Sequence, residues 1–222
     1  MPLRRAFISF PKSGRTWLRY AFRLAGVEEQ IDFHHDGFEY SDGSRPALDF
    51  DFDARLARSL DVDRLIYLDR DPRDVMVSLY HQVTGRFRTT FNYAGSLSDF
   101  IRDPYFGAEN LAEFRRQWDE VCRRRPVCRV SYEDCHRDFR AVLGSAMDYL
   151  GFPCPQQQLA DIVEGSSFSR MRQVEQSGTF DQPWLRTRDG APKVRRGQTG
   201  SHRLDLNPAD LAFLNQVFQL EP

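Results

Sequence analysis

Lysine is almost absent from this chain of 222 residues. Of its 31 basic residues, only Lys12 and Lys193 are lysine, and the others are arginine. A genome with strong codon bias produces such a preference, which favours a bacterial source. A lysine that persists under this bias suggests a position where a compact ammonium, rather than any cation, is required.

Cysteine is also scarce, and its positions form no familiar framework. The four cysteines stand at positions 122, 128, 135 and 154, with no Cys-x-x-Cys pair and no metal-ligand spacing. This pattern argues against a disulfide scaffold and against a structural metal site. It favours reduced thiols in a cytoplasmic protein that needs no metal.

Excess charge and long hydrophobic runs are missing as well. The formal net charge of −1 argues against nucleic-acid binding through bulk positive charge. No apolar run is long enough for a transmembrane segment, and Lys12 interrupts the N-terminal stretch before a signal-peptide core could form. With 41% hydrophobic and 28% charged residues, the composition predicts a globular chain, most simply a single domain over residues 1–222.

Predicted strands and helices alternate along the chain. Apolar runs rich in strand-forming residues predict strands at 6–10, 64–70 and 126–131. Periodic apolar positions predict helices at 16–25, 52–60, 73–81, 97–102, 111–122, 137–150, 156–164 and 208–219. Residues 27–50 are expected to be irregular and residues 85–96 to form a loop, and residues 176–203 show little periodicity. The alternation predicts an α/β fold with a mostly parallel central sheet flanked by helices, and ligands beyond the carboxyl ends of the strands.

The stretch from Phe7 to Trp17 predicts an anion site. A buried strand ends at Pro11, the tight turn Lys12-Ser13-Gly14 follows, and a helix begins at Thr16. A strand, a short loop and a helix N-terminus aim several backbone N–H groups at one point, where the helix dipole and Lys12 add positive potential. The loop is not a Walker A motif, because its lysine comes first rather than near the end of a longer loop.

A second anion-binding pattern follows the second predicted strand. In Arg70-Asp-Pro-Arg-Asp-Val-Met-Val-Ser78, the arginine ends a strand and the serine lies in the next helix. A guanidinium and a hydroxyl placed in this way are able to bind one phosphate from two sides. The simpler alternative is an ion pair between Arg70 and a neighbouring aspartate.

Together these motifs resemble those of the cytosolic-type sulfotransferases, which use 3′-phosphoadenosine 5′-phosphosulfate (PAPS) as sulfuryl donor. Pro11-Lys-Ser-Gly-Arg-Thr-Trp17 resembles their 5′-phosphosulfate loop, and Arg70 to Ser78 resembles their 3′-phosphate motif. Three shorter segments match in the family's order, beginning at Val130, Ser166 and Val194. The resemblance covers most of the chain, is closest in style to small bacterial members, and implies a P-loop-like α/β domain.

The resemblance also implies roles for individual residues. Lys12 stabilises the leaving oxygen, and Tyr132 and Phe168 lie near the adenine. The residues implied in binding PAPS, or its product adenosine 3′,5′-bisphosphate (PAP), are Lys12, Ser13, Gly14, Arg15, Thr16, Trp17, Arg70, Ser78, Tyr132, Ser166, Phe168, Arg195, Arg196 and Gly197.

A histidine is expected to act as the catalytic base, because neutral imidazole is able to take a hydroxyl proton near pH 7. His35 and His34 are the candidates, and we assign the role to His35. Animal members carry Lys-x-His here, whereas this chain has Phe33 at the lysine position if His35 aligns with their histidine. The family's final Gly-Asp-Trp is replaced by Gly200-Ser-His202.

The alternatives to a sulfotransferase are a silent bisphosphate-binding module and a nucleotide-dependent kinase on a related fold. The expected acceptor is a hydroxyl or amine of a small molecule, a lipid or a carbohydrate, bound among loops 31–50, 85–106 and 176–193. These loops carry aromatic residues among arginines. The pattern leaves the acceptor and the oligomeric state open.

Overall fold

The computed structural model describes residues 3–40, 45, 47, 48 and 50–221. Its central sheet has the strand order β2-β1-β3-β4, and every neighbouring pair is parallel. The strands are β1 (Arg5–Ser9), β2 (Asp32–His34), β3 (Arg64–Asp69) and β4 (Cys128–Ser131). The α/β fold expected from the sequence is therefore confirmed.

Helices precede and follow these strands throughout the chain. The α-helices are α1 (Arg15–Leu24), α2 (Phe52–Leu60), α3 (Pro72–His81), α4 (Arg88–Phe91), α5 (Leu97–Ile101), α6 (Ala108–Arg124), α7 (Tyr132–Arg137), α8 (Phe139–Leu150), α9 (Gln156–Gly165), α10 (Phe168–Ser177) and α11 (Pro208–Phe218). Short 3₁₀ helices occur at η1 (Glu28–Gln30), η3 (Pro183–Leu185) and η4 (Ser201–Leu204), and a π-helix at η2 (Gln82–Arg86). Among the described residues, no helix is both long enough and apolar enough to cross a membrane.

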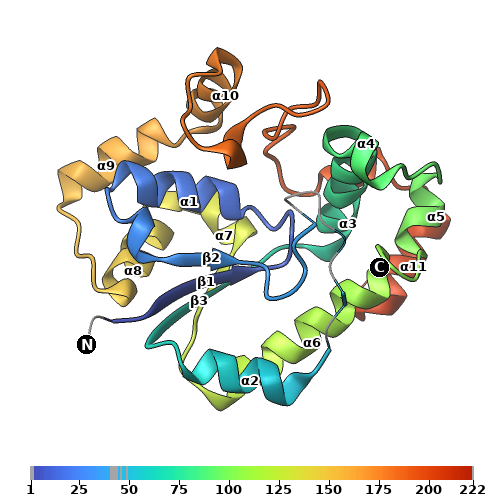
Figure 1. Cartoon of the computed structure of the whole chain (residues 1–222), viewed down its shortest axis with the longest axis horizontal. Helices are drawn as coiled ribbons and strands as arrows, with labels where there is room; N and C mark the ends of the chain where they lie inside the picture. Colours follow the sequence, from blue (N-terminus) through green and yellow to red (C-terminus); the bar gives the residue numbers. More distant parts are fainter. Residues whose placement is uncertain (1–2, 41–44, 46, 49, 222) are drawn as a thin grey trace.

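The helices form one layer on each face of the sheet (Figure 1). Alternate residues of a strand point to opposite faces, so Ala6 and Ile8 of β1 join one core cluster and Phe7 joins the other. The first cluster includes Leu111 and Trp118 of α6, and the second contains residues of α1, α8 and α9. Both faces of the sheet are buried, as a parallel sheet requires.

A third apolar cluster attaches the chain after α9 to α1. Tyr20 packs with Met171 of α10 and Leu185, and Trp184 is among the residues packed against them. Figure 1 accordingly shows α10 and the irregular chain after it lying over one end of the layer that contains α1. This places residues 178–200 beside the carboxyl ends of the strands.

Two expectations about secondary structure were wrong, and two further α-helices, α7 and α10, were not expected. Residues 32–34 form a sheet strand inside the stretch 27–50, and 85–96 includes the end of the π-helix and α4. The helix expected at 137–150 is preceded by a separate one, α7, because Asp138 breaks and caps the chain. The helix α10 ends inside 176–203, and its few apolar residues are stabilised by the third cluster rather than by a strong local pattern.

Candidate active site

The four strands end around one cavity of about 480 Å³. Lys12 follows β1, His35 follows β2, Arg70 follows β3 and Tyr132 follows β4, and all four residues line it. Segments from the second half of the chain close the other side, including Phe168 and residues 193–198. The site therefore lies where ligands bind in open parallel sheets, beyond the carboxyl ends of the strands.

The turn after β1 has a backbone that leaves donors free for an anion. Lys12 and Gly14 have positive φ angles of 74° and 104°. A Cβ atom at Gly14 would lie 2.4 Å from the Tyr132 ring, so only glycine fits. The N–H of Trp17 donates to the Gly14 carbonyl at 2.9 Å, so it is not available to a ligand. Among the described residues, the N–H groups at 14, 15 and 16 have no such partner.

Lys12 is held in the cavity in an unusual electrostatic environment. Its Nζ donates to Oε1 of Gln82 at 3.1 Å. Burial lowers the Lys12 pKa to about 7, and the nearby charges of Arg86, Arg70 and Arg195 act in the same direction. A bound anion would favour the charged ammonium, so this side chain is suited to respond to phosphate or sulfate.

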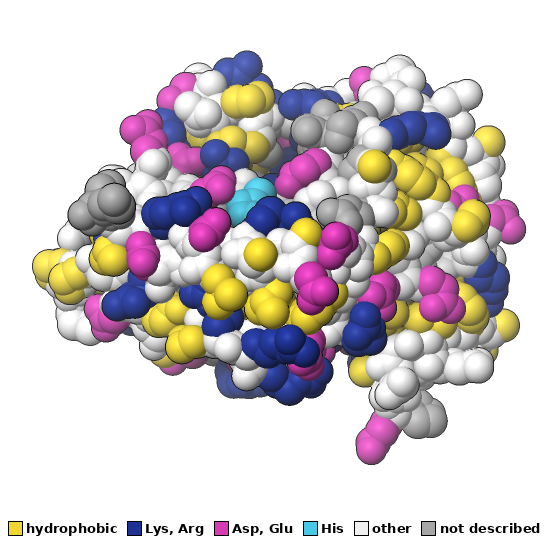
Figure 2. All heavy atoms as spheres, turned by 60° about the horizontal axis from the view of Figure 1, so that its bottom comes forward, with side chains coloured by type: hydrophobic (Ala, Val, Ile, Leu, Met, Phe, Trp, Pro, Cys, Tyr) yellow, Lys and Arg dark blue, Asp and Glu magenta, His cyan; other side chains and the backbone are white. Residues whose placement is uncertain are grey.

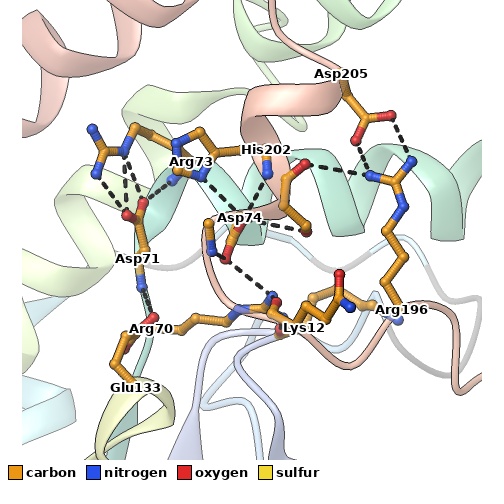
Figure 3. Close-up of polar contacts among 12 residues, drawn as sticks. Lys12, Arg70, Asp71, Arg73, Asp74, Glu133, Arg196, His202 and Asp205 are labelled. Carbon is orange, nitrogen blue, oxygen red and sulfur yellow. Dashed lines mark hydrogen bonds and ion pairs between the residues drawn. The ribbon is translucent and has the colours of Figure 1, made fainter. Parts of the chain in front are cut away.

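Asp74 organises the wall of the cavity around Arg70 (Figure 3). Its carboxylate accepts hydrogen bonds from the N–H groups of Gly200 at 2.8 Å and His202 at 2.9 Å, and from Nη2 of Arg70 at 3.3 Å. Burial tends to raise the Asp74 pKa, but the His202 hydrogen bonds and the Arg70 charge outweigh it and leave that pKa lowered. Asp74 thereby joins the start of α3 to the segment at 198–202.

Arg70 is oriented by this wall and by an aromatic ring. Its guanidinium lies 4.1 Å from the centre of the Tyr132 ring and donates to the carbonyls of Lys12 at 3.2 Å and Gln198 at 3.0 Å. Its Nε is buried without a hydrogen-bond partner. The ion pair with Asp74 proposed as the alternative is present, yet Arg70 still lines the cavity together with Ser78 and Arg195.

Two residues predicted to contact the nucleotide have side chains that already bind other groups of the protein. Arg196 lines the cavity but is ion-paired with Asp205 and donates to the Ser201 carbonyl. Ser166 is fully buried and its hydroxyl donates to the Ile162 carbonyl at 2.7 Å, whereas its neighbour Ser167 lines the cavity.

The aromatic residues expected near adenine are placed around the same cavity. Trp17 stacks on Phe139 at 4.2 Å between ring centres and meets Tyr132 edge-on, so one face of its indole is already covered. Phe168 is 37% exposed and packs so close to Gly197 that a Cβ atom there would lie 2.2 Å from its ring. Gly197 therefore permits Phe168 to lie at the cavity wall.

His35, rather than His34, points into the cavity. It is 2% exposed, and its Nδ1 lies 2.6 Å from the Ser9 carbonyl oxygen. Because a carbonyl only accepts, Nδ1 carries the proton and the lone pair is on Nε2. Burial, followed by the charge of Arg15, lowers the His35 pKa well below its ordinary value. His34 is half-exposed, lies 3.9 Å from Asp32 and is not part of the cavity lining.

The loop that carries His35 is anchored by residues that sequence reasoning missed. Asp36, with φ of 48°, forms a buried ion pair with Arg55 of α2, and Arg55 also donates to Gln117 of α6. Breaking a buried pair of this kind costs about 3–5 kcal/mol. The local signal was the Asp36-Gly37 turn, but nothing in the sequence marked Arg55 as its partner.

The chain also matches known proteins. A family model described as the sulfotransferase domain matches residues 6–221. Sulfotransferase 2B1 of Rattus norvegicus is 26% identical over 161 residues, which are 70% of this chain and 46% of that protein. The chain thus spans about half the length of the curated relatives it matches.

Solved structures show the same fold at low sequence identity. Mouse sulfotransferase SULT7A1 complexed with PAP aligns with a TM-score of 0.71 and 17% identity, over 99% of this chain and 83% of that chain. Retinol dehydratase in complex with androsterone and PAP aligns with a TM-score of 0.63 and 18% identity, over 99% of this chain and 81% of that chain.

Proposed function

Because the chain belongs to the sulfotransferase family, we propose that it transfers the sulfuryl group of PAPS to an acceptor hydroxyl or amine. The observation that carries this proposal is the convergence of three groups on one cavity. These are the free N–H groups at the start of α1 with Lys12, the arginines near Arg70, and the buried neutral base His35.

The residues present fit a nucleotide with anionic groups at two positions. The turn at 14–16 offers free N–H groups to the 5′-phosphate, and Thr16 adds a hydroxyl to the lining. Arg70, Ser78 and Arg195 are the residues we assign to the 3′-phosphate, and the unpartnered Nε of Arg70 fits that role. The adenine is assigned to the aromatic wall formed by Trp17, Tyr132 and Phe168, with Phe139 behind Trp17.

The proton chemistry follows from the tautomer of His35. Nε2 accepts the proton of the acceptor hydroxyl as the acceptor oxygen attacks sulfur in line with the leaving oxygen. The bond from sulfur to the phosphate oxygen breaks, and Lys12 stabilises the charge left on that oxygen. General-base assistance of this kind contributes about 10²–10⁴-fold to the rate.

The rival functions are less well supported. A silent bisphosphate-binding module has no need for a buried neutral histidine in the same cavity as a lysine with a pKa near 7. A nucleotide-dependent kinase of the related P-loop fold needs the longer Walker A loop with its lysine near the end, which the sequence lacks. The proposal leaves four classes of acceptor open: a lipid, a phenol, an aryl compound or a sugar. It also includes a single domain over residues 1–222, a cytoplasmic location and a bacterial source.

The proposal is tested by following sulfate from radiolabelled PAPS into a panel of small hydroxyl and amine compounds, with products identified by mass spectrometry. We expect transfer that persists in EDTA and is lost in Lys12→Met. Tight PAP binding without transfer to any acceptor would favour the silent module. Transfer of phosphate from ATP that stops in EDTA would favour the kinase.

A further inference from the structure

As far as the structure describes the chain, the lining of the active-site cavity carries basic side chains and no carboxylate. It contains Lys12, Lys193 and several arginines, but no Asp or Glu among the residues that the structure describes. On the outer face shown in Figure 2, by contrast, basic and acidic side chains are interspersed. The net charge of the whole chain is therefore close to zero although basic side chains are concentrated around this cavity.

The proposed donor accounts for only part of this charge. Arg70, Arg195 and Arg196 are at the 3′-phosphate side, and Lys12 with the N-terminus of α1 faces the phosphosulfate. Of the other cations in the lining, Arg19 is paired with Glu28 and Arg86 with Glu175. This leaves Arg188, Lys193 and the guanidinium of Arg15, whose backbone N–H we assign to the donor; we call these three side chains the acceptor-side cations. Within the described part of the chain, their charged groups make no hydrogen bond or ion pair, and Arg15 Nη1 is buried without a partner.

Two of the acceptor-side cations lie near His35, and the third, Arg188, lies near Lys193. Arg15 and Lys193 are both close enough to His35 for their charges to lower its pKa. Burial lowers the Lys193 pKa well below its ordinary value, and the charges of Lys12, Arg86, Arg15 and Arg188 lower it further. The carboxylates near these groups are Glu175, close to Lys12, and Glu39 and Asp32, close to Arg15.

The segment that carries Lys193 is firmly attached. The buried carboxylate of Glu175 accepts hydrogen bonds from the N–H groups of Lys193 at 2.5 Å and Val194 at 2.9 Å, and lies 3.8 Å from Arg86. Arg188 is held over the Phe87 ring at 5.1 Å, and its backbone pairs with Ala191. These basic groups are therefore held in place, and within the described part of the chain no carboxylate pairs with them.

We propose that the acceptor is an anionic hydroxyl compound, whose carboxylate, phosphate or sulfate binds Arg15, Arg188 and Lys193 while its hydroxyl faces His35. This rests on the proposed sulfotransfer. An anion lowers the repulsion among like charges that are buried together, whereas an uncharged acceptor leaves it uncompensated. The acceptor would then differ from androsterone and retinol, the uncharged ligands of the retinol dehydratase complexes.

The test compares two probes of nearly equal shape, 4-hydroxyphenylacetate and its uncharged analogue 4-hydroxyphenylacetamide. Each is titrated by calorimetry into the full chain saturated with PAP. We expect the carboxylate to bind at least about tenfold more tightly, as one charge-assisted contact implies. In Arg188→Met the preference should largely disappear, while in Arg172→Met, which removes an exposed arginine outside the cavity, it should persist.

Three outcomes overturn the inference: equal affinity for the two probes, no binding of the carboxylate at millimolar concentration, or a preference that survives in Arg188→Met. The last would mean that the carboxylate occupies the place of the transferred sulfate. As a second readout, kcat/KM for sulfation of the carboxylate should exceed that of the amide and converge with it in Arg188→Met. Failure to bind PAP at all would instead refute the proposed function.

Discussion

Asp74 and His202, 128 positions apart in the sequence, are joined by two hydrogen bonds. The His202 backbone N–H donates at 2.9 Å and its ring Nδ1 lies 3.1 Å from the same carboxylate oxygen. His202 stands in Gly200-Ser-His202, where the sequence departs from the family's Gly-Asp-Trp. At this point of departure, His202 attaches α3 to the segment that follows Arg195 to Gln198.

Removing the His202 ring should weaken nucleotide binding without abolishing it. In His202→Ala the backbone hydrogen bond remains and one hydrogen bond to a charged group is lost, worth about 1.5–3 kcal/mol when buried. We expect PAP affinity to fall by about tenfold or somewhat more by calorimetry. Arg203→Ala, which changes an exposed neighbour in the same short helix, is the control. Unchanged PAP affinity in His202→Ala would show that this attachment does not position the nucleotide site.

The 3′-phosphate should dominate nucleotide selectivity. Arg70, Ser78 and Arg195 line one wall, while Arg196 is already paired with Asp205 and should add less. Two charged hydrogen bonds correspond to about 10²-fold or more in affinity. PAP should therefore bind at least that much more tightly than 5′-AMP by calorimetry, and Arg195→Met should reduce the difference. Equal affinities for the two nucleotides would show that these residues do not bind the 3′-phosphate.

His35 should affect turnover and not nucleotide binding. His35→Ala is expected to lower kcat by about 10²-fold or more while PAP affinity stays within a few-fold. Because its pKa is lowered, His35 is a neutral base at pH 7, and the acid limb of the pH–rate profile should lie below about 6.5. His34→Ala, at the neighbouring histidine, is the matched control and should lower kcat only slightly. If only the His34 variant loses activity, the assignment of the base is reversed.

PAP binding should draw protons onto the protein above neutral pH. Lys12 has a pKa of about 7 in the free protein, so it is mostly neutral at pH 8.5, and a bound phosphate favours its charged form. Proton uptake on binding means that PAP affinity falls as the pH rises through this range. Calorimetry in buffers of different ionisation enthalpy measures the uptake directly, and Lys12→Met should reduce it. A proton count of zero in the wild type would mean that Lys12 is already charged.

Lys12→Arg should keep the fold and much of the PAP affinity but lose most turnover. An ammonium is a compact charge that follows one bridging oxygen, whereas a planar guanidinium prefers two oxygens. Arginine would also remain charged among Arg70, Arg86 and Arg195, whose repulsion Lys12 escapes by losing its proton. Single-turnover sulfation measures the effect. A rate within a few-fold of the wild type would mean that position 12 supplies only positive charge.

The backbone of those parts of the site that are built from residues adjacent in the chain could be predicted without a structure. The turn from Pro11 to Thr16 follows from a strand end, a glycine and a helix start that are adjacent in the chain. The helix from Pro72 to His81 likewise follows from Asp71-Pro72, which caps and opens it. These segments specify their own backbone, so the turn at 11–16, the step from the end of β3 into α3 and the parallel α/β architecture could all be predicted. Anion binding at these segments stays a prediction.

Contacts between distant residues decided the rest. The strand β2 has only three residues and forms because it pairs with β1, and this pairing brings His35 rather than His34 to the Ser9 carbonyl. The Asp36–Arg55 pair and the attachment of Lys193 to Glu175 likewise join residues with no local pattern between them. A single sequence records which residues carry charge, but whether those charges are paired or left free in a cavity depends on the folded chain bringing their partners within reach.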